Sequence, residues 1–230
     1  MKGRIFTTGL TTIYLILASA LLVSCKEEDN SIEEFPDWKN RNEAFFDQIF
    51  ESALSEMANG NGEWKVFRNW SLSDEEDYVP KTTDHIVVKV IKDGHSANPA
   101  PLYNDTVHVS YCGRLLPSTS YANGKIFDDK MGEGDNPLTF TYIKGAANSY
   151  VDGFSTALQN IRVGDLWRVY IPWQLGYGQD GASETVNKEK RQLVPGYSTL
   201  VFDVYLKAYF HPGQPAPDVQ AKTTTAEWIE

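Results

Sequence analysis

The sequence predicts an α+β domain, built from an antiparallel sheet of five or six strands and one short helix and preceded by an N-terminal amphipathic helix. Three observations lead to this fold class. Short runs alternate between apolar and polar residues, as half-buried strands do, at 86–91, 106–111, 125–127, 138–142, 166–171 and 200–206. Residues 150–160 have helical spacing between these runs. Residues 38–58 have the same spacing over a longer stretch, ahead of the first run.

The longer helix has one apolar face. Its apolar residues recur at three- and four-residue steps and are Phe45, Phe46, Ile49, Phe50, Ala53, Leu54 and Met57. The sequence NGNG at residues 59–62 ends it. Such a face must be covered, either by the main domain or by a second copy of the helix. We expect packing within one chain, and a dimer through helix 38–58 is the alternative to this monomer.

The first residues have the features of an export signal. Lys2 and Arg4 precede an apolar run that ends in the sequence LVSC, with Cys25 last, and this resembles a bacterial lipobox. Residues 26–29 (KEED) look like the surface-export signal of Bacteroidetes lipoproteins. We therefore expect a signal peptide at 1–24, an acylated Cys25 with a tether at 25–37, and an outer-membrane protein attached through lipid only. Exposure at the cell surface is a further expectation.

Composition limits the classes of partner. The chain has 230 residues and a net charge of −10, and it contains no cluster of basic residues. An acidic chain of this kind is a poor binder of nucleic acid. Its length suits one compact domain with extensions. We expect a helical extension at 38–84, the main domain at 85–210 and a mobile tail at 211–230.

The sequence contains no pattern for a metal or a cofactor, and we predict neither. The histidines are scattered and are His85, His95, His108 and His211. The acids between 128 and 135 lack the ligand spacing of an EF-hand calcium loop. If Cys25 is acylated, no disulfide can form, and Cys112 lies in an apolar strand run. We expect Cys112 to be a buried, inert thiol.

The order of these elements and six short motifs in them resemble the FKBP-type peptidyl-prolyl isomerases, over about residues 85–210. One motif alone would be weak, but all six occur in the family's order. The matching stretches are 109–115 (VSYCGRL), 124–128 (GKIFD), 151–154 (VDGF), 163–165 (VGD), 171–178 (IPWQLGYG) and 194–206 (VPGYSTLVFDVYL).

The resemblance implies a curved sheet wrapped around a short helix, with an apolar cleft between them that binds a proline ring. By position, Phe154 would form the floor of the cleft. The walls would be Tyr111, Phe127, Leu138, Val151 and Phe202. The rim would be Tyr177, Leu193 and Val194. Asp128 would hydrogen-bond near the wall, and the backbone N–H of Val151 would hold a ligand carbonyl.

The activity implied is cis-trans isomerisation of X-Pro bonds in exported or surface polypeptides, which needs no nucleophile, metal or cofactor. Two alternatives stay open. The domain could bind proline segments or act as a chaperone with little catalysis, or it could be a structural lipoprotein with a vestigial fold. The two pocket substitutions, at Phe154 and Leu138, keep the proline-binding alternative open. In all, four features depart from the compact family pattern. They are an enlarged hairpin at 116–122, a long charged loop after Gly178, Phe154 in place of Trp, and Leu138 where an aromatic residue is common.

Overall fold

The computed structural model describes residues 32–72, 77–131, 143–147 and 150–211. Several sequence-based predictions fall outside these ranges: the signal peptide and Cys25, the strand at 138–142 with Leu138, and the tail beyond residue 211. Within the described residues, no helix has the length and the apolar character needed to cross a membrane.

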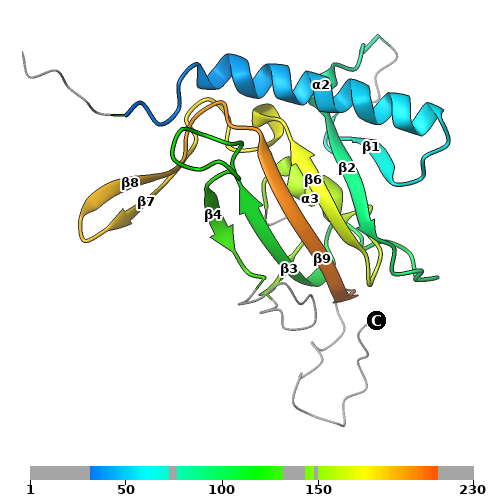
Figure 1. Ribbon diagram of the computed structural model, residues 1–230. Helices are drawn as coiled ribbons and strands as arrows, with labels where there is room; N and C mark the ends of the chain where they lie inside the picture. Colours follow the sequence, from blue (N-terminus) through cyan, green and yellow to red (C-terminus); the bar gives the residue numbers. More distant parts are fainter. Residues whose placement is uncertain (1–31, 73–76, 132–142, 148–149, 212–230) are drawn as a thin grey trace, which may run out of the picture. The chain divides into compact units, whose positions relative to one another are not determined.

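An antiparallel sheet forms the centre of the domain (Figure 1). Its spatial order is β1 (Trp64–Arg68), β2 (His85–Lys92), β6 (Leu166–Ile171), β9 (Leu200–Phe210), β3 (Thr106–Arg114) and β4 (Ile126–Asp129). A seventh strand, β5 (Ile143–Ala146), pairs with the first half of β3, while β4 pairs with its second half. Every neighbouring pair is antiparallel, which confirms the predicted α+β class.

Two helices pack on the sheet. The short helix α3 (Asp152–Leu158) lies against β1, β2 and β6, with six of its seven residues buried, in the same core as Ile86 and Val88 of β2. The long helix α2 (Trp38–Ala58) contacts β1 and β2 from the other face, where Phe46 and Ala53 pack on Val87. Because neighbouring residues of a strand point to opposite faces, this edge of the sheet is covered on both sides.

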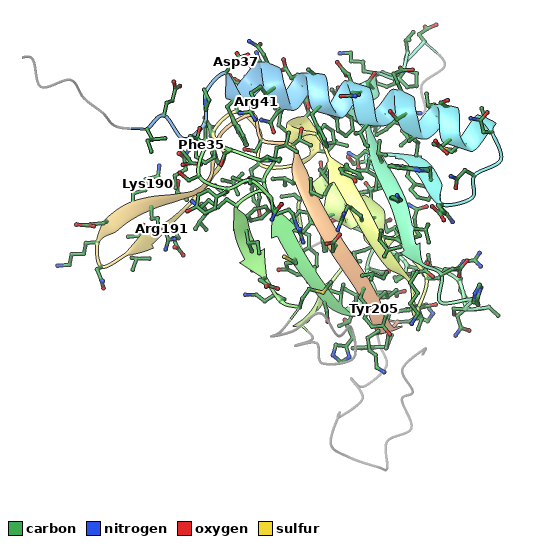
Figure 2. The ribbon with its side chains drawn as sticks, viewed as in Figure 1. Phe35, Asp37, Arg41, Lys190, Arg191 and Tyr205 are labelled. Carbon is green, nitrogen blue, oxygen red and sulfur yellow. The ribbon has the colours of Figure 1, made fainter. Side chains whose placement is uncertain are left out.

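The start of α2 is fixed to the enlarged loop between β3 and β4. Glu34 accepts hydrogen bonds from the hydroxyl of Ser118 and from the N–H of Ser120. Arg41 donates to the carbonyl oxygen of Pro117 at 2.9 Å. Figure 2 shows Phe35 and Arg41 at this end of α2. The residues of the enlarged loop at 116–122 therefore bind the N-terminal extension of the same chain by hydrogen bonds.

Two features differ from the sequence-based prediction. Strand β1 lies in a stretch for which no strand was predicted, and it pairs along its whole length with β2. The charged segment after Gly178, predicted as a loop, forms a separate hairpin of β7 (Ala182–Val186) and β8 (Glu189–Val194), which carries Lys190 and Arg191 (Figure 2). Asn187 and Lys188 at its tip have φ angles of 52° and 70°, the left-handed pair that a tight two-residue turn requires.

Two short 3-10 helices complete the described elements, η2 (Thr82–Asp84) before β2 and η4 (Trp173–Leu175) after β6. Cys112 on β3 is buried, and burial raises the pKa of its thiol. The prediction that Cys112 is buried is confirmed, and a thiol that stays protonated is a poor nucleophile.

Candidate functional site

A cavity of about 190 Å³ opens between the sheet and the N-terminal end of α3. Its lining residues are Tyr111, Asp128, Tyr150, Val151, Phe154, Tyr177 and Phe202. They come from strands β3, β4 and β9, from α3 and the residues just before it, and from the turn after η4. Pockets for drug-sized ligands hold roughly 300–1,000 Å³, so this cavity suits a single ring-sized group.

Aromatic rings form the interior of the cavity and pack edge to face. The ring of Phe154, on α3, lies with its centroid 5.2 Å from Tyr111 and 4.9 Å from Phe202, at interplanar angles of 69° and 68°. Tyr150 adds a tilted contact with Phe154 at 4.9 Å. Edge-to-face pairs are each favourable by about 0.5–1.5 kcal/mol beyond the area they bury. These contacts hold the walls in place before any ligand enters.

One hydrogen bond ties the aromatic wall to a carboxylate. The hydroxyl of Tyr111 donates to Oδ2 of Asp128 at 2.8 Å, and Lys130 Nζ lies 3.1 Å from Oδ1 of the same carboxylate. Burial, and then this hydrogen bond, raises the pKa of Tyr111 far above its ordinary value. Burial, followed by the negative charge of Asp128, also raises the pKa of Tyr150 and of Tyr177. All three hydroxyls therefore keep their protons at neutral pH and are able to donate hydrogen bonds, as Tyr111 does.

A glycine makes room for two of the rings. A Cβ at Gly113 would lie 2.5 Å from Cε1 of Phe202 and 2.7 Å from Cζ of Phe127, which is closer than any real Cβ contact. The centroids of these two rings are 5.5 Å apart. Because Gly113 on β3 has no side chain, the rings of Phe202 and Phe127 can pack directly over its backbone.

Val151 stands at the entrance to α3, as its N-cap residue, with extended backbone angles of −59° and 150°. Its carbonyl oxygen accepts the first hydrogen bond of the helix, from the N–H of Ser155. The N–H of Val151 has no partner among the described residues. A peptide carbonyl that entered the cavity would find a donor at this point.

The mouth of the cavity continues into a second hollow of about 450 Å³ beneath the β7–β8 hairpin. Asp128 and Tyr177 line both hollows. The other residues that line the second hollow are Phe127, Lys130, Ala182, Glu184, Arg191, Leu193 and Val194. Asp128 and Tyr177 therefore stand where the hollows meet; Tyr177 is 37% exposed, and its ring lies 6.3 Å from that of Phe127 in the second hollow.

The structure brings together most of the residues that the sequence indicated. Six of them line the first cavity: Tyr111, Asp128, Val151, Phe154, Tyr177 and Phe202. Phe127, Leu193 and Val194 line the adjoining hollow, and Leu138 lies outside the described residues. Tyr150 lines the cavity and was not predicted, although an aromatic residue directly before Val151 was a readable signal.

The described residues include no group of three or more His, Cys, Asp or Glu side chains that could hold a metal ion. Aromatic rings line one end of the cavity, and a carboxylate, hydroxyl groups and a backbone N–H lie at the other.

Comparison with known proteins agrees with this geometry. Residues 98–207 match the model of the FKBP-type peptidyl-prolyl cis-trans isomerase family. Among curated relatives, a macrophage infectivity potentiator of Trypanosoma cruzi is 36% identical over 111 residues, which are 48% of this chain and 46% of the relative. The FKBP-type peptidyl-prolyl cis-trans isomerase FkpA of Escherichia coli is 30% identical over 182 residues, or 76% of this chain and 57% of the relative.

Residues 98–207 are therefore similar to the FKBP-type peptidyl-prolyl cis-trans isomerase family, in agreement with the resemblance seen in the motifs. The chain spans about half the length of the curated relatives it matches. The crystal structure of FkpA from Escherichia coli aligns with a TM-score of 0.43 at 22% identity, over 94% of this chain and 76% of that one.

Proposed function

We propose that this protein is a peptidyl-prolyl cis-trans isomerase whose substrates are proline-containing polypeptides. The observation that carries the proposal is the cavity itself: a ring-sized hollow with Phe154, Tyr111 and Phe202 at edge-to-face angles around it. It lies within the segment that matches the isomerase family.

The reaction needs a shaped apolar environment more than it needs reactive groups. An X-Pro bond favours the trans form by only about 0.5–1 kcal/mol, yet its rotation barrier is about 18–20 kcal/mol because planarity is maintained by resonance. The twisted amide has lost that resonance and with it part of the charge separation between oxygen and nitrogen. A dry aromatic cavity therefore favours the twisted amide over the planar form, and such differential binding lowers the barrier.

Polar groups at the mouth complete the proposed site. The proline ring would sit against Phe154, between Tyr111 and Phe202, and its carbonyl would accept a hydrogen bond from the N–H of Val151. The hydroxyl of Tyr177 would donate to the carbonyl before proline as that bond turns. Asp128 would act through Tyr111, whose ring it fixes by the 2.8 Å hydrogen bond. Phe127, Leu193 and Val194 would contact the residues beside the proline.

We also infer that the mature protein begins at an acylated Cys25, lies at the outer membrane and serves exported or surface polypeptides. The apolar run ending in LVSC and the acidic residues after it support this. Replacing Cys25 with Ala should move the protein from the membrane fraction to the soluble fraction. An unchanged distribution between the fractions would contradict the lipid anchor.

Refolding of a protein limited by prolyl isomerisation tests the function. Uncatalysed isomerisation takes about 10–100 s at 25 °C. The chain should shorten this slow phase and leave the fast phases unchanged, and the Phe154→Ala variant should lose the effect. Acceleration of every phase, or none from a folded protein, would favour a chaperone or a proline-binding module instead.

A further inference from the structure

The rim of the cavity is assembled from two segments that are held together as one unit. The N–H of Tyr197 donates to the carbonyl oxygen of Gly178 at 3.0 Å. Gly196 packs so closely on Gln179 that a Cβ would lie 1.8 Å from the oxygen of Gln179. These contacts couple the turn that carries Tyr177 to the base of the β7–β8 hairpin. We call residues 176–181 and 194–199 the rim.

Asn42 on α2 binds this rim from a fully buried position. Its side chain is 0% exposed, and Oδ1 accepts a hydrogen bond from the N–H of Thr199 at 2.8 Å. The carbonyl oxygen of Asn42 accepts a second bond from the Thr199 hydroxyl at 3.1 Å, and its Nδ2 donates to the carbonyl of Trp38 at 2.6 Å. Since buried polar groups need partners, Asn42 and Thr199 satisfy each other.

Two more residues of α2 contact the rim or the turn before it. Nε1 of Trp38 donates to the hydroxyl of Ser198 at 2.9 Å, and that hydroxyl donates in turn to the carbonyl of Pro195 at 2.6 Å. Glu43 accepts a hydrogen bond at 3.2 Å from Nε1 of Trp173, which begins η4 just ahead of the rim. The first two turns of α2 thus contact the second segment of the rim and the turn just ahead of the first segment.

We propose that α2 is a positioning element of the proline site, with Asn42 and Trp38 as its positioning residues. Residues 176–181 and 195–197 of the rim are loop that is partly or fully exposed, and such loops open at low free energy unless other elements hold them. Hydrogen bonds from a helix that is itself packed on the sheet fix the rim, so that Tyr177 faces the cavity before substrate arrives. The part of this claim that concerns catalysis rests on the proposed isomerase function.

Two variants and a matched control test the proposal. Trp38→Phe replaces the indole by a smaller aromatic ring and removes its N–H donor. Asn42→Ala removes the contacts that the Asn42 side chain makes with Trp38 and with Thr199. The control is Phe50→Ala, at the far end of α2, where Phe50 packs beside His85 with ring centroids 5.5 Å apart. The measurements are catalysed exchange of an X-Pro peptide by NMR, the ring signals of Tyr177, assigned with Tyr177→Phe, and thermal unfolding.

We expect Asn42→Ala to lower catalysed exchange by about tenfold or more, because small misplacements at a site have effects of that size, and to shift the Tyr177 signals. Trp38→Phe should act in the same direction and more weakly. Phe50→Ala should lower the melting temperature and leave both the exchange and the Tyr177 signals as they are. If Asn42→Ala fails to fold, Trp38→Phe decides the question.

Unchanged Tyr177 signals in the folded variants would overturn the proposal, as would an equal loss of exchange in Phe50→Ala. A wild-type protein that catalyses no exchange would remove the proposed enzyme function. The Tyr177 signals would still show whether α2 positions the rim, so the two failures can be told apart.

Discussion

Tyr111→Phe removes one oxygen atom and leaves the aromatic wall in place. The lost hydroxyl donates to Oδ2 of Asp128 at 2.8 Å, and Tyr111 is only 7% exposed. Hydrogen bonds to charged groups contribute about 1.5–3 kcal/mol to stability. The Asp128 side chain is 36% exposed, and its Oδ1 lies 3.1 Å from Nζ of Lys130. Water and the lysine can therefore partly replace the hydrogen bond that the carboxylate loses. We therefore expect a loss near the lower limit, about 1.5 kcal/mol.

Urea denaturation of the wild type, Tyr111→Phe, Asp128→Ala and the double variant measures this loss and isolates the pair. For a chain of this size, about 1.5 kcal/mol corresponds to a fall in melting temperature of roughly 3–6 °C. The coupling energy from the cycle should reach about 1 kcal/mol. A Tyr111→Phe protein as stable as the wild type, or a coupling energy below about 0.3 kcal/mol, would show that this hydrogen bond does not hold the wall.

Three further results should follow from the same geometry. Gly113→Ala should destabilise the fold by about 1–3 kcal/mol and weaken proline binding, because its Cβ would displace Phe202 and Phe127; normal peptide titration would contradict this. Burial raises the pKa of the cavity's tyrosine hydroxyls, so as the pH rises the unfolded chain loses these protons before the folded chain does. The stability that these hydroxyls contribute should therefore be complete below about pH 10 and fall above it. A constant urea midpoint from about pH 9 to 11 would refute this. Asp203→Ala removes two hydrogen bonds from Arg168, on the face of β9 opposite to the cavity. It should lower the free energy of unfolding by about 1–2 kcal/mol and leave peptide binding unchanged. A large loss of peptide binding would show that the two faces of β9 do not act separately.

Elements with a strong period and clear stops could be predicted from the sequence. The apolar spacing of residues 38–58 and the NGNG that follows gave α2 with its observed bounds. Strand β6 likewise matches the alternating run at 166–171. In both cases a polar face and an apolar face are distinct, because one side meets the core and the other is more exposed.

Strand β1 lacked such a signal for a physical reason. All five of its residues are partly buried, since α2 covers one face of this edge and α3 lies on the other. Apolar residues therefore occur on both faces, as with Phe67 stacked on Trp167 on one side and Trp64 stacked on Tyr170 on the other. Without alternation, the segment could not be told from a loop.

The β7–β8 hairpin escaped prediction for the opposite reason. Most of its residues are exposed and many are charged, so its strands show no apolar face. Its readable signal was Asn187, a residue that accepts the left-handed conformation at a tight turn.

The candidate site could be predicted only through the family motifs. By pattern alone, Tyr111 and Phe154 are apolar residues of a strand and a helix, like any others in the core. The contact between Asn42 and the rim could not be predicted, because Asn42 lies 157 positions before Thr199 and its partner is a backbone N–H. Contacts of this kind follow from the fold rather than from local sequence.

Catalysed cis-trans exchange of a short X-Pro peptide, followed by NMR for the wild type, Phe127→Ala and Tyr177→Phe, tests the central claim most directly. Our account predicts catalysed exchange by the wild type, its collapse in Phe127→Ala and a smaller loss in Tyr177→Phe, since the apolar shape should matter more than the hydroxyl group. A folded wild-type protein that shifts the peptide signals without accelerating exchange would contradict the account and leave a proline-binding module.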